Sequence, residues 1–309
     1  MPKYEEELRN KLAKTRAPVT VGQYIKRLQV LNDGKPITSM KFLTDFDAIL
    51  TKLENLKLAF TTKTSYLAAI CATLGLYSKY HKLYKRYQEK MIQNANEIKG
   101  DLAKNERNDK QKESILPKEE VVRVREELKK AFDESPLLTT KVWELLLAHL
   151  CICLYSLISP RRNRDYSEMW VVLEEPAELD KTKNYYVASE HLFIFNNYKT
   201  KEVYGEQRFP VPAPLVEVLE EYLNFYVRVL DVSNATEFPL LVHFNGTRVH
   251  PINGITRILN KAFDRKVGST ALRHIFVSDE FSAVLEKQKR VAFEMSHSVQ
   301  TQKDYTKIV

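Results

Sequence analysis

Apolar residues in the first third of the chain recur at helical spacing. Between Thr20 and Leu31 they fall three and four positions apart, which places them on one face of a helix that begins at a threonine N-cap. Turn-forming residues at 33–36 end that helix. The same spacing predicts further helices over 45–56, 61–80 and 81–98. We therefore expect a four-helix unit in this part of the chain.

The pattern changes at residues 96–114, where polar and charged residues replace the apolar stripe. This stretch contains no aromatic residue and no sustained hydrophobic period. Such a composition is typical of a linker between domains. The sequence therefore predicts a basic helical domain at residues 1–95 and a second domain at residues 115–309.

Residues 115–309 combine helical and strand patterns. Short β-branched and aromatic runs, bounded by turn residues, predict strands at 184–188, 192–195 and 208–211. Helices are predicted at 118–133, 139–158, 213–229, 252–264, 269–282 and 284–296. The second of these helices is almost wholly apolar and should be buried. The expected fold class is mainly α with a small antiparallel β-sheet.

Positive charge is concentrated near the N-terminus. The 309 residues include 48 Lys+Arg and 40 Asp+Glu, a formal net charge of +8. Residues 1–112 hold 22 Lys+Arg and 12 Asp+Glu, so they carry +10 and the remaining residues −2. A basic module beside a near-neutral one suits a partner with a phosphate backbone, although a solvated Lys-rich helical surface has the same composition. The candidate DNA-contacting residues are Lys79, Lys82, Lys85 and Arg86.

Composition excludes several classes of protein. Hydrophobic residues make up 44% and charged residues 28%, which is typical of a globular chain rather than a disordered one. No apolar run reaches the ~18–20 residues that span a bilayer, and the N-terminus lacks the features of a signal peptide. We therefore expect an intracellular protein. Cys71, Cys151 and Cys153 lie in apolar segments without metal-ligand partners, and should be reduced core residues.

Three arginines follow the predicted buried helix, at positions 161, 162 and 164. They cannot all be core groups, so at least one should face a cleft. Asp165 lies three residues beyond Arg162 and, one helical turn away, would brace that arginine. Arg161 and Arg164 remain alternatives to Arg162.

Other candidates lie in a turn between two predicted strands and near the C-terminus. Lys199, with Lys201 as the alternative, lies in the turn, where a lysine is commonly only solvated. The later candidates are Arg273 and His274, near the start of a predicted helix, and His297 and Tyr305.

An ordered set of arginines, lysine, histidine and tyrosine suits attack of a tyrosine hydroxyl on a phosphodiester. Guanidinium groups stabilise the charge on the phosphorane oxygens bidentately and without a metal. A lysine can protonate the leaving 5′ oxygen, and a histidine can accept the tyrosine proton or hold a phosphate oxygen. The product is a phosphotyrosyl enzyme, which conserves the bond energy for joining to another strand end.

With these motifs, nearly the whole chain resembles the tyrosine recombinase (integrase) family. Residues 17–95 resemble its helical SAM-like core-binding domain, and residues 115–309 resemble its α+β catalytic domain. Leu272-Arg273-His274 is similar to the family's Leu-Arg-His box, and Met295-Ser296-His297-Ser298 with Tyr305 is similar to its Gly-His-Ser…Tyr box. Arg162 with Asp165 resembles the first-arginine motif, and Lys199 resembles the lysine of the mobile β-hairpin.

The resemblance implies a role for each candidate. Arg162 and Arg273 would clamp the phosphate, Lys199 would be the general acid, His297 an acid/base or phosphate ligand, and Tyr305 the nucleophile. It also implies double-stranded DNA as partner, two or four protomers on paired sites, and no metal or nucleotide cofactor. The expected activity is site-specific recombination or integration through a 3′-phosphotyrosyl intermediate. The expected location is the bacterial cytoplasm, or the host cytoplasm or nucleus for a viral protein.

The chain departs from the family's pattern at several points. Thr270 stands where a histidine is common, and is a better candidate for a helix N-cap than for a catalytic group. His274 could form a hydrogen bond in the core instead of serving the site. Ser296 replaces a glycine, and the interval from His297 to Tyr305 is one residue shorter than expected. Four residues follow Tyr305, so we expect either an unusual mode of assembly or a truncated chain.

Two alternative functions remain open. A type IB topoisomerase shares the chemistry, but would not be expected to carry this basic four-helix unit. A catalytically silent DNA-binding protein of the same fold is consistent with the threonine at position 270.

Overall fold

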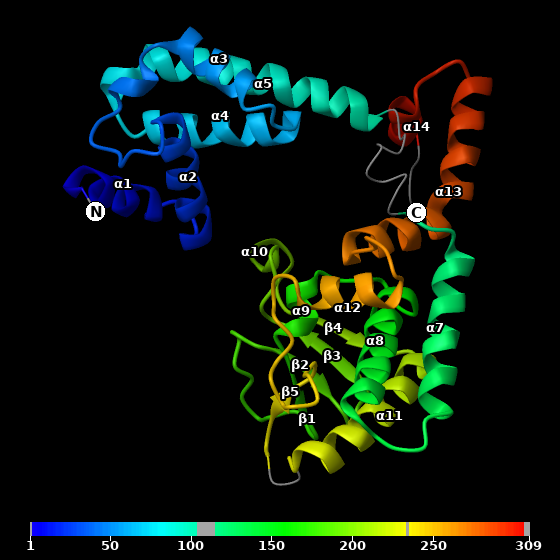
Figure 1. Cartoon of the computed structure of the whole chain (residues 1–309). Helices are drawn as coiled ribbons and strands as arrows, with labels where there is room; N and C mark the ends of the chain where they lie inside the picture. The colour runs from blue at the N-terminus through cyan, green and yellow to red at the C-terminus, as the bar shows by residue number, and fades with distance from the viewer. Residues whose placement is uncertain (1, 104–114, 233–234, 306–309) are drawn as a thin grey trace. The chain divides into compact units, whose positions relative to one another are not determined.

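The computed structural model describes residues 2–103, 115–232 and 235–305, and the chain divides into two compact units (Figure 1). The first unit comprises residues 1–106 and the second residues 107–309. Helix α5 (His81–Ala103) extends into the predicted linker, 96–114, whose residues 104–114 lie outside the described residues.

The first unit is helical, as the pattern of apolar residues predicts. Its elements are α1 (Lys3–Ala13), α2 (Pro18–Leu31), η1 (Lys41–Leu43), α3 (Phe46–Asn55), α4 (Phe60–Leu74), η2 (Ser78–Tyr80) and α5. The four predicted helices correspond to α2, α3, α4 and α5. Helix α1 was not predicted, because only Leu8 and Leu12 of its apolar residues are buried and the rest of its sequence is polar.

A buried carboxylate joins α1 to the rest of the first unit. Glu5 is 2% exposed and accepts hydrogen bonds from Arg9 Nη2 at 3.0 Å and from the backbone N–H of Ile37 at 3.1 Å. The amide of Gln29 on α2 donates to both carboxylate oxygens, at 3.2 and 3.0 Å. Burial raises the pKa of Glu5, but these hydrogen bonds outweigh it and hold the pKa below the ordinary value of 4.5.

The second unit consists of helices and a small sheet. Its helices are α7 (Lys118–Asp133), α8 (Thr140–Ser156), α9 (Asn163–Ser167), α10 (Lys201–Tyr204), α11 (Ala213–Leu230), α12 (Gly254–Ala262), α13 (Ser269–Glu294) and α14 (Val299–Tyr305). Its strands are β1 (Met169–Val172), β2 (Asn184–Val187), β3 (Leu192–Phe195), β4 (Gln207–Pro210) and β5 (Phe238–Pro239). The predicted mainly helical composition with a small sheet is therefore confirmed.

The sheet is mixed, so the prediction of a purely antiparallel sheet is wrong. The strand order is β4-β3-β2-β1-β5, and β1 pairs with β2 in parallel, whereas the other pairs are antiparallel. The error arises because β1 and β5 were not predicted. Without β1, the remaining three strands form only antiparallel pairs. Residues 173–183 form the crossover connection that the parallel pair requires.

Helix α8 is the centre of the second unit's core. Its side chains from Trp143 to Tyr155 are mostly buried, and it contacts α7, α11, α12 and α13 (Figure 1). Because nearly all of its surface is apolar, α8 can be buried by the surrounding helices, as the sequence predicts. Cys151 and Cys153 on this helix, like Cys71 in the first unit, are free and buried.

Helix α13 is one helix where the sequence predicts two, at 269–282 and 284–296. Its N-terminal part packs in the core through Leu272 and Ile275. Nearly all the residues from Val277 to Arg290 are exposed, so the buried stripe stops while the helix continues. No helix in the described ranges combines the length and the apolar composition needed to cross a bilayer.

Replacing Glu5 by Gln should destabilise α1 and α2 by about 1–3 kcal/mol at pH 7, because the amide cannot accept all the hydrogen bonds of the carboxylate. The folded-state pKa is lowered, so this stabilisation is present above pH 4.5 and disappears as the pH falls through the lower, folded-state value. The difference between the two proteins should therefore shrink below that pH.

Hydrogen exchange of α1 and α2 peptides, compared between the proteins at each pH, measures the effect. Glu6→Gln is the matched control, because Glu6 lies in the same helical turn and is exposed. An equal loss of protection in both variants would contradict the role of the buried carboxylate.

Candidate active site

Arg161, rather than Arg162, is the arginine that Asp165 braces. The Arg161 Nε donates to Asp165 Oδ2 at 3.2 Å, and both side chains are largely buried. The prediction that Asp165 braces Arg162 is therefore wrong. Helix α9 begins only at Asn163, so Arg162 is its N-cap residue, in extended backbone, with its side chain exposed. Because Arg162 precedes the helix, its spacing of three residues from Asp165 does not place the two side chains on one helical face.

The β3–β4 hairpin holds the other side of the Arg161 guanidinium. The Arg161 Nη1 donates to Gln207 Oε1 at 2.6 Å. The guanidinium carbon lies 4.0 Å from the ring centroid of Phe195 and 4.6 Å from that of Tyr198. Cation–π contact and two hydrogen bonds fix the orientation of the group. No local pattern in the sequence indicates these partners, since the aromatic residues lie more than thirty positions away.

A second arginine approaches the same place from α13. Arg273 is half-buried, and the charges of both Arg273 and Arg161 act on the Tyr166 hydroxyl. Burial raises the pKa of Tyr166, and the two arginines oppose part of that rise. Tyr166 accepts from the backbone N–H of Arg161 at 3.3 Å and donates to the carbonyl of Leu154 at 3.2 Å. Arg161 thus contacts the buried Tyr166 through its backbone N–H, and the charge of Arg273 acts on the same hydroxyl from α13.

Polar side chains connect the helices that carry this pair. The Tyr155 hydroxyl donates to Asn163 Oδ1 at 2.8 Å, and Asn163 Nδ2 donates to Thr256 Oγ1 on α12 at 3.1 Å. The start of α13 joins this group, because Ser269 forms a hydrogen bond that lowers the pKa of Tyr155 against the larger effect of burial. The ends of α8 and α13 are thereby held to α9 and α12.

The amide of Asn184 fixes the connection that carries Lys199. It is 1% exposed, and its Nδ2 donates to the carbonyls of Asp165 at 3.1 Å and Asn197 at 3.0 Å. Its Oδ1 accepts from the backbone N–H groups of Asn196 at 3.0 Å and Asn197 at 2.7 Å. One side chain therefore joins the turn after β3 to α9. Sequence reasoning missed it, because an asparagine at a strand end normally indicates only a turn.

Lys199 lies in the connection between β3 and β4, where the sequence places it. Its side chain is exposed, and Lys201 is half-buried at the start of α10. The Tyr198 hydroxyl donates to the carbonyl of Gly205 at 2.6 Å and closes the connection on itself. Gly205 has φ of 65° and ψ of −157°, a conformation that residues with a Cβ rarely adopt. The connection is thus anchored at both ends, with Lys199 toward solvent.

Two predictions about the start of α13 are wrong. Thr270 is not the N-cap, because the helix begins at Ser269 and its N-cap residue is Gly268; Thr270 is exposed one position further on. His274 does not form a hydrogen bond in the core, since its side chain is exposed. Position 270 follows the buried Ser269, and at this point of the helix it points away from the core.

His297 and Tyr305 form a separate group after α13. Their ring centroids are 5.7 Å apart, with an interplanar angle of 37°. The Ser298 hydroxyl accepts from the backbone N–H of Thr301 at 3.0 Å and so caps α14, the helix that ends with Tyr305. The Nε2 of His297 is buried without a hydrogen-bond partner among the described residues, and Tyr305 is 69% exposed.

Ser296 ends α13 in the position that usually holds glycine. Its φ is 54°, in the left-handed region, and the backbone N–H of His297 donates to the carbonyl of Ala292 at 3.0 Å. This is the C-terminal arrangement in which glycine is favoured, because it has no Cβ. The left-handed conformation explains why the Gly-His-Ser motif has a glycine at this position. In this chain Ser296 adopts the same conformation.

The five resemblance-based candidates do not form one cluster. Arg273 lies in the first turns of α13, whereas His297 follows its last turn, and Figure 1 shows α14 beside the end of α13 that lies away from α8 and α9. Within the described ranges, no interaction links His297 or Tyr305 to Arg161, Arg273 or Lys199. The structure therefore brings together an arginine pair and, separately, a histidine–tyrosine pair.

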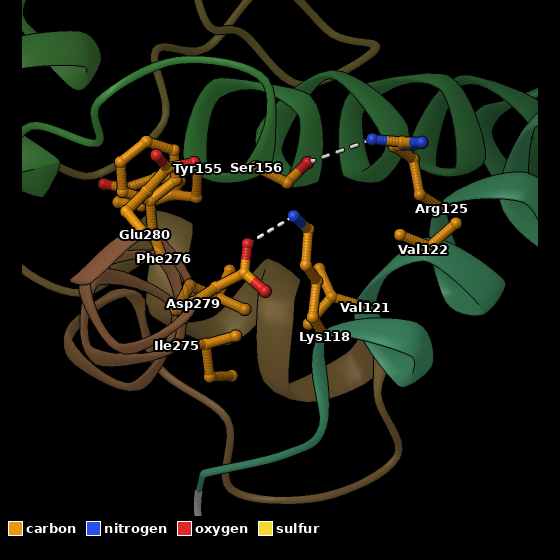
Figure 2. Close-up of a pocket in the computed structure, with 11 residues that line it drawn as sticks. Lys118, Val121, Val122, Arg125, Tyr155, Ser156, Ile275, Phe276, Asp279 and Glu280 are labelled. Carbon is orange, nitrogen blue, oxygen red and sulfur yellow. Dashed lines mark hydrogen bonds and ion pairs between the residues drawn. The ribbon is translucent and has the colours of Figure 1, made fainter. Parts of the chain in front are cut away.

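A cavity of about 70 Å³ marks where the anchored part of α13 ends. It lies between α7, the end of α8 and α13 (Figure 2). Lys118 at the start of α7 forms an ion pair with Asp279, and Arg125 Nη1 donates to Ser156 Oγ at 3.5 Å across the cavity. The ion pair holds α13 as far as its third turn, whereas the Arg125–Ser156 bond joins α7 to α8.

The basic candidates of the first unit are exposed. Lys79 lies in η2, and Lys82, Lys85 and Arg86 lie in the first turns of α5. Because the last three are three and four positions apart, they share one face of the helix. The Arg86 guanidinium also lies 4.2 Å from the ring centroid of Phe46. These cations are free to meet an anionic surface.

A buried Cys–His pair on α8 is not a second active site. Cys153 Sγ and His149 Nε2 are 3.5 Å apart. Burial raises the pKa of Cys153 to about 12 and lowers the pKa of His149 to about 4, so neither group is charged near neutral pH. The described residues contain no group of His, Cys, Asp and Glu side chains that could hold a metal ion.

Replacing Asn184 by Ala should destabilise the second unit by about 2–4 kcal/mol, because it leaves two buried carbonyls and two N–H groups without their partner. The expected result is a lower urea midpoint, followed by the fluorescence of Trp143 and Trp170. Asn197→Ala is the matched control. It removes only an exposed bond to the carbonyl of Thr182, and should cost well under 1 kcal/mol. Equal costs would contradict the anchoring role of Asn184.

The site must be interpreted from its own geometry. Comparison of the chain with protein-family models, curated proteins and solved structures finds no match.

Proposed function

We propose that this protein is a tyrosine recombinase that cleaves and rejoins DNA through a 3′-phosphotyrosyl intermediate. The observation that supports it best is the arginine pair beside Tyr166. Arg161 is oriented by Asp165 and Gln207, and Arg273 lies near the same hydroxyl. Arg161, whose guanidinium is fixed, and Arg273 can together bind the non-bridging oxygens of one phosphate and stabilise the charge that develops on them.

In this proposal Arg161 replaces Arg162 as the first phosphate clamp. A preorganised donor stabilises a transition state better than a mobile one, since it needs no reorganisation during the reaction. Arg162 is exposed and lies beside the pair, where it adds positive charge for the DNA backbone. Lys199 protonates the leaving 5′ oxygen from the β3–β4 connection, and Tyr305 attacks the phosphorus, with His297 accepting its proton.

This chemistry requires Tyr305 to approach the arginine pair. The exposed part of α13 beyond Asp279 is the segment that must move, unless a second protomer supplies Tyr305. Few buried side chains restrain that segment, so its rearrangement costs little packing energy. Enzymes of this kind commonly complete their active site only on binding the substrate.

The separation of the two groups also favours a second candidate function. A DNA-binding protein that uses the same basic surfaces without cleavage would not need Tyr305 near the arginines. The exposed cations of α5 and the arginine pair would then only bind phosphates. Cleavage is therefore the property to test first.

The proposed cleavage predicts a covalent protein–DNA adduct. Incubation with nicked suicide duplexes of random sequence should give a denaturant-resistant adduct, because the released end diffuses away and traps the phosphotyrosine. Tyr305→Phe should abolish the adduct, as read by a shifted band on a denaturing gel.

Tyr204→Phe is the matched control, because Tyr204 is also exposed, in the same unit. An adduct that survives Tyr305→Phe would refute Tyr305 as nucleophile. Absence of any adduct, with DNA binding retained, would favour the non-cleaving protein.

DNA binding should be strongly dependent on salt through the exposed cations of α5. In the double variant Lys82→Glu/Arg86→Glu, the slope of log Kd against log salt should become shallower by about 1–2, or about one for each phosphate that the variant no longer neutralises. Fluorescence anisotropy with a labelled duplex measures the slope. The control is Lys130→Glu/Lys287→Glu, which makes the same charge change at exposed positions of the second unit. Equal changes in both variants would indicate only a general effect of net charge.

A further inference from the structure

A second cavity, away from the arginine pair, lies between α7, α8 and α12. Its volume is about 360 Å³. Its apolar lining consists of Leu128, Leu145, Leu147, Ala148, Ile258 and Ala262. Apart from the imidazole of His243, no side-chain ring lines the cavity among the described residues. An apolar lining that is aliphatic favours a flexible hydrocarbon chain over a planar ring, which would gain from stacking.

The polar residues at the edge of this cavity are mostly cationic. Lys141, Arg257 and Lys261 are exposed at the edge, and Lys261 forms an ion pair with Glu144 that links α12 to α8. Lys141 and Arg257 have no acidic partner among the described residues. Two unpaired cations beside an apolar cavity complement a ligand with an anionic head and an apolar body.

We infer that this cavity binds a medium-chain fatty acid. At about 30 Å³ for each water-sized group, it has room for roughly a dozen such groups, which matches a chain of about ten carbons with its carboxylate. The chain lies against the aliphatic side chains of the three helices, and Lys141 and Arg257 bind the carboxylate. The inference is independent of the proposed cleavage of DNA, since none of these residues belongs to that site.

Isothermal titration of the full chain with decanoate tests this site. Decanoate should bind with micromolar affinity. Butyrate, which keeps the carboxylate but lacks most of the chain, and decyltrimethylammonium, which keeps the chain but reverses the charge, should each bind about tenfold more weakly or worse. All ligands are used below the concentrations at which they form micelles.

Two pairs of variants locate the binding. Ala262→Trp fills the cavity and should abolish decanoate binding, whereas Ala131→Trp, at an exposed position of α7, should not change it. Lys141→Glu should weaken binding about tenfold, whereas Lys287→Glu, at an exposed position of α13, should not. Thermal unfolding of each variant confirms that it is folded.

Several outcomes would overturn the inference. They are absence of decanoate binding up to about 1 mM, equal binding of the cationic amphiphile, or binding that survives Ala262→Trp. Sedimentation of the same variants identifies the main competing occupant. If Ala262→Trp and Lys141→Glu alter the association state while decanoate does not bind, the cavity is a contact for a protein, and the fatty-acid site is refuted.

Discussion

The side-chain amide of Asn184 is the interaction on which the arrangement of the second unit's polar site depends. It donates to two carbonyls and accepts from two N–H groups, so one buried residue satisfies the backbone of α9 and of the turn after β3. Asp165, whose carbonyl it holds, orients Arg161, and the turn leads to Tyr198, which packs on the same guanidinium. Asn184 therefore fixes the positions of Arg161, of Asp165 and of the connection that carries Lys199.

Much of the fold could be predicted, because the longer elements bury a regular stripe. Helix α7 has the predicted bounds and α8 nearly so, since an apolar face or an apolar surface all round leaves few alternatives. The failures have specific causes. Helix α1 buries too few apolar residues to show a period, β5 has only two residues, and α13 continues after its buried stripe stops at Ile275. The spacing of apolar residues reveals a helix or strand only where that element buries a regular set of side chains. These three segments bury few side chains, so the spacing does not reveal them.

The candidate site was predictable in its residue types but not in its geometry. Local spacing suggested Arg162 with Asp165, whereas the bond is made by Arg161, because the backbone is still extended before α9 begins. The partners that orient Arg161, Gln207 and Phe195, lie on strands distant in sequence and have no local signature. His297 and Tyr305 do lie together, since α14 is short and directly follows. Whether the arginine pair meets the histidine–tyrosine pair depends on α13, which the local pattern predicted as two helices and which is continuous.

The parallel pairing of β1 and β2 has a consequence for the order of folding. The antiparallel hairpin β2–β3 closes a connection of only four residues, 188–191, whereas β1 can pair with β2 only after the longer crossover 173–183 has been placed. The bonds of Asn184 then join positions 19 and 13 residues apart. Loop entropy must be lost before such long-range bonds repay it. The β2–β3 hairpin, which begins with Asn184, therefore forms before β1 joins it, and the bond from Asn184 to the carbonyl of Asp165 forms only when β1 and the crossover are in place.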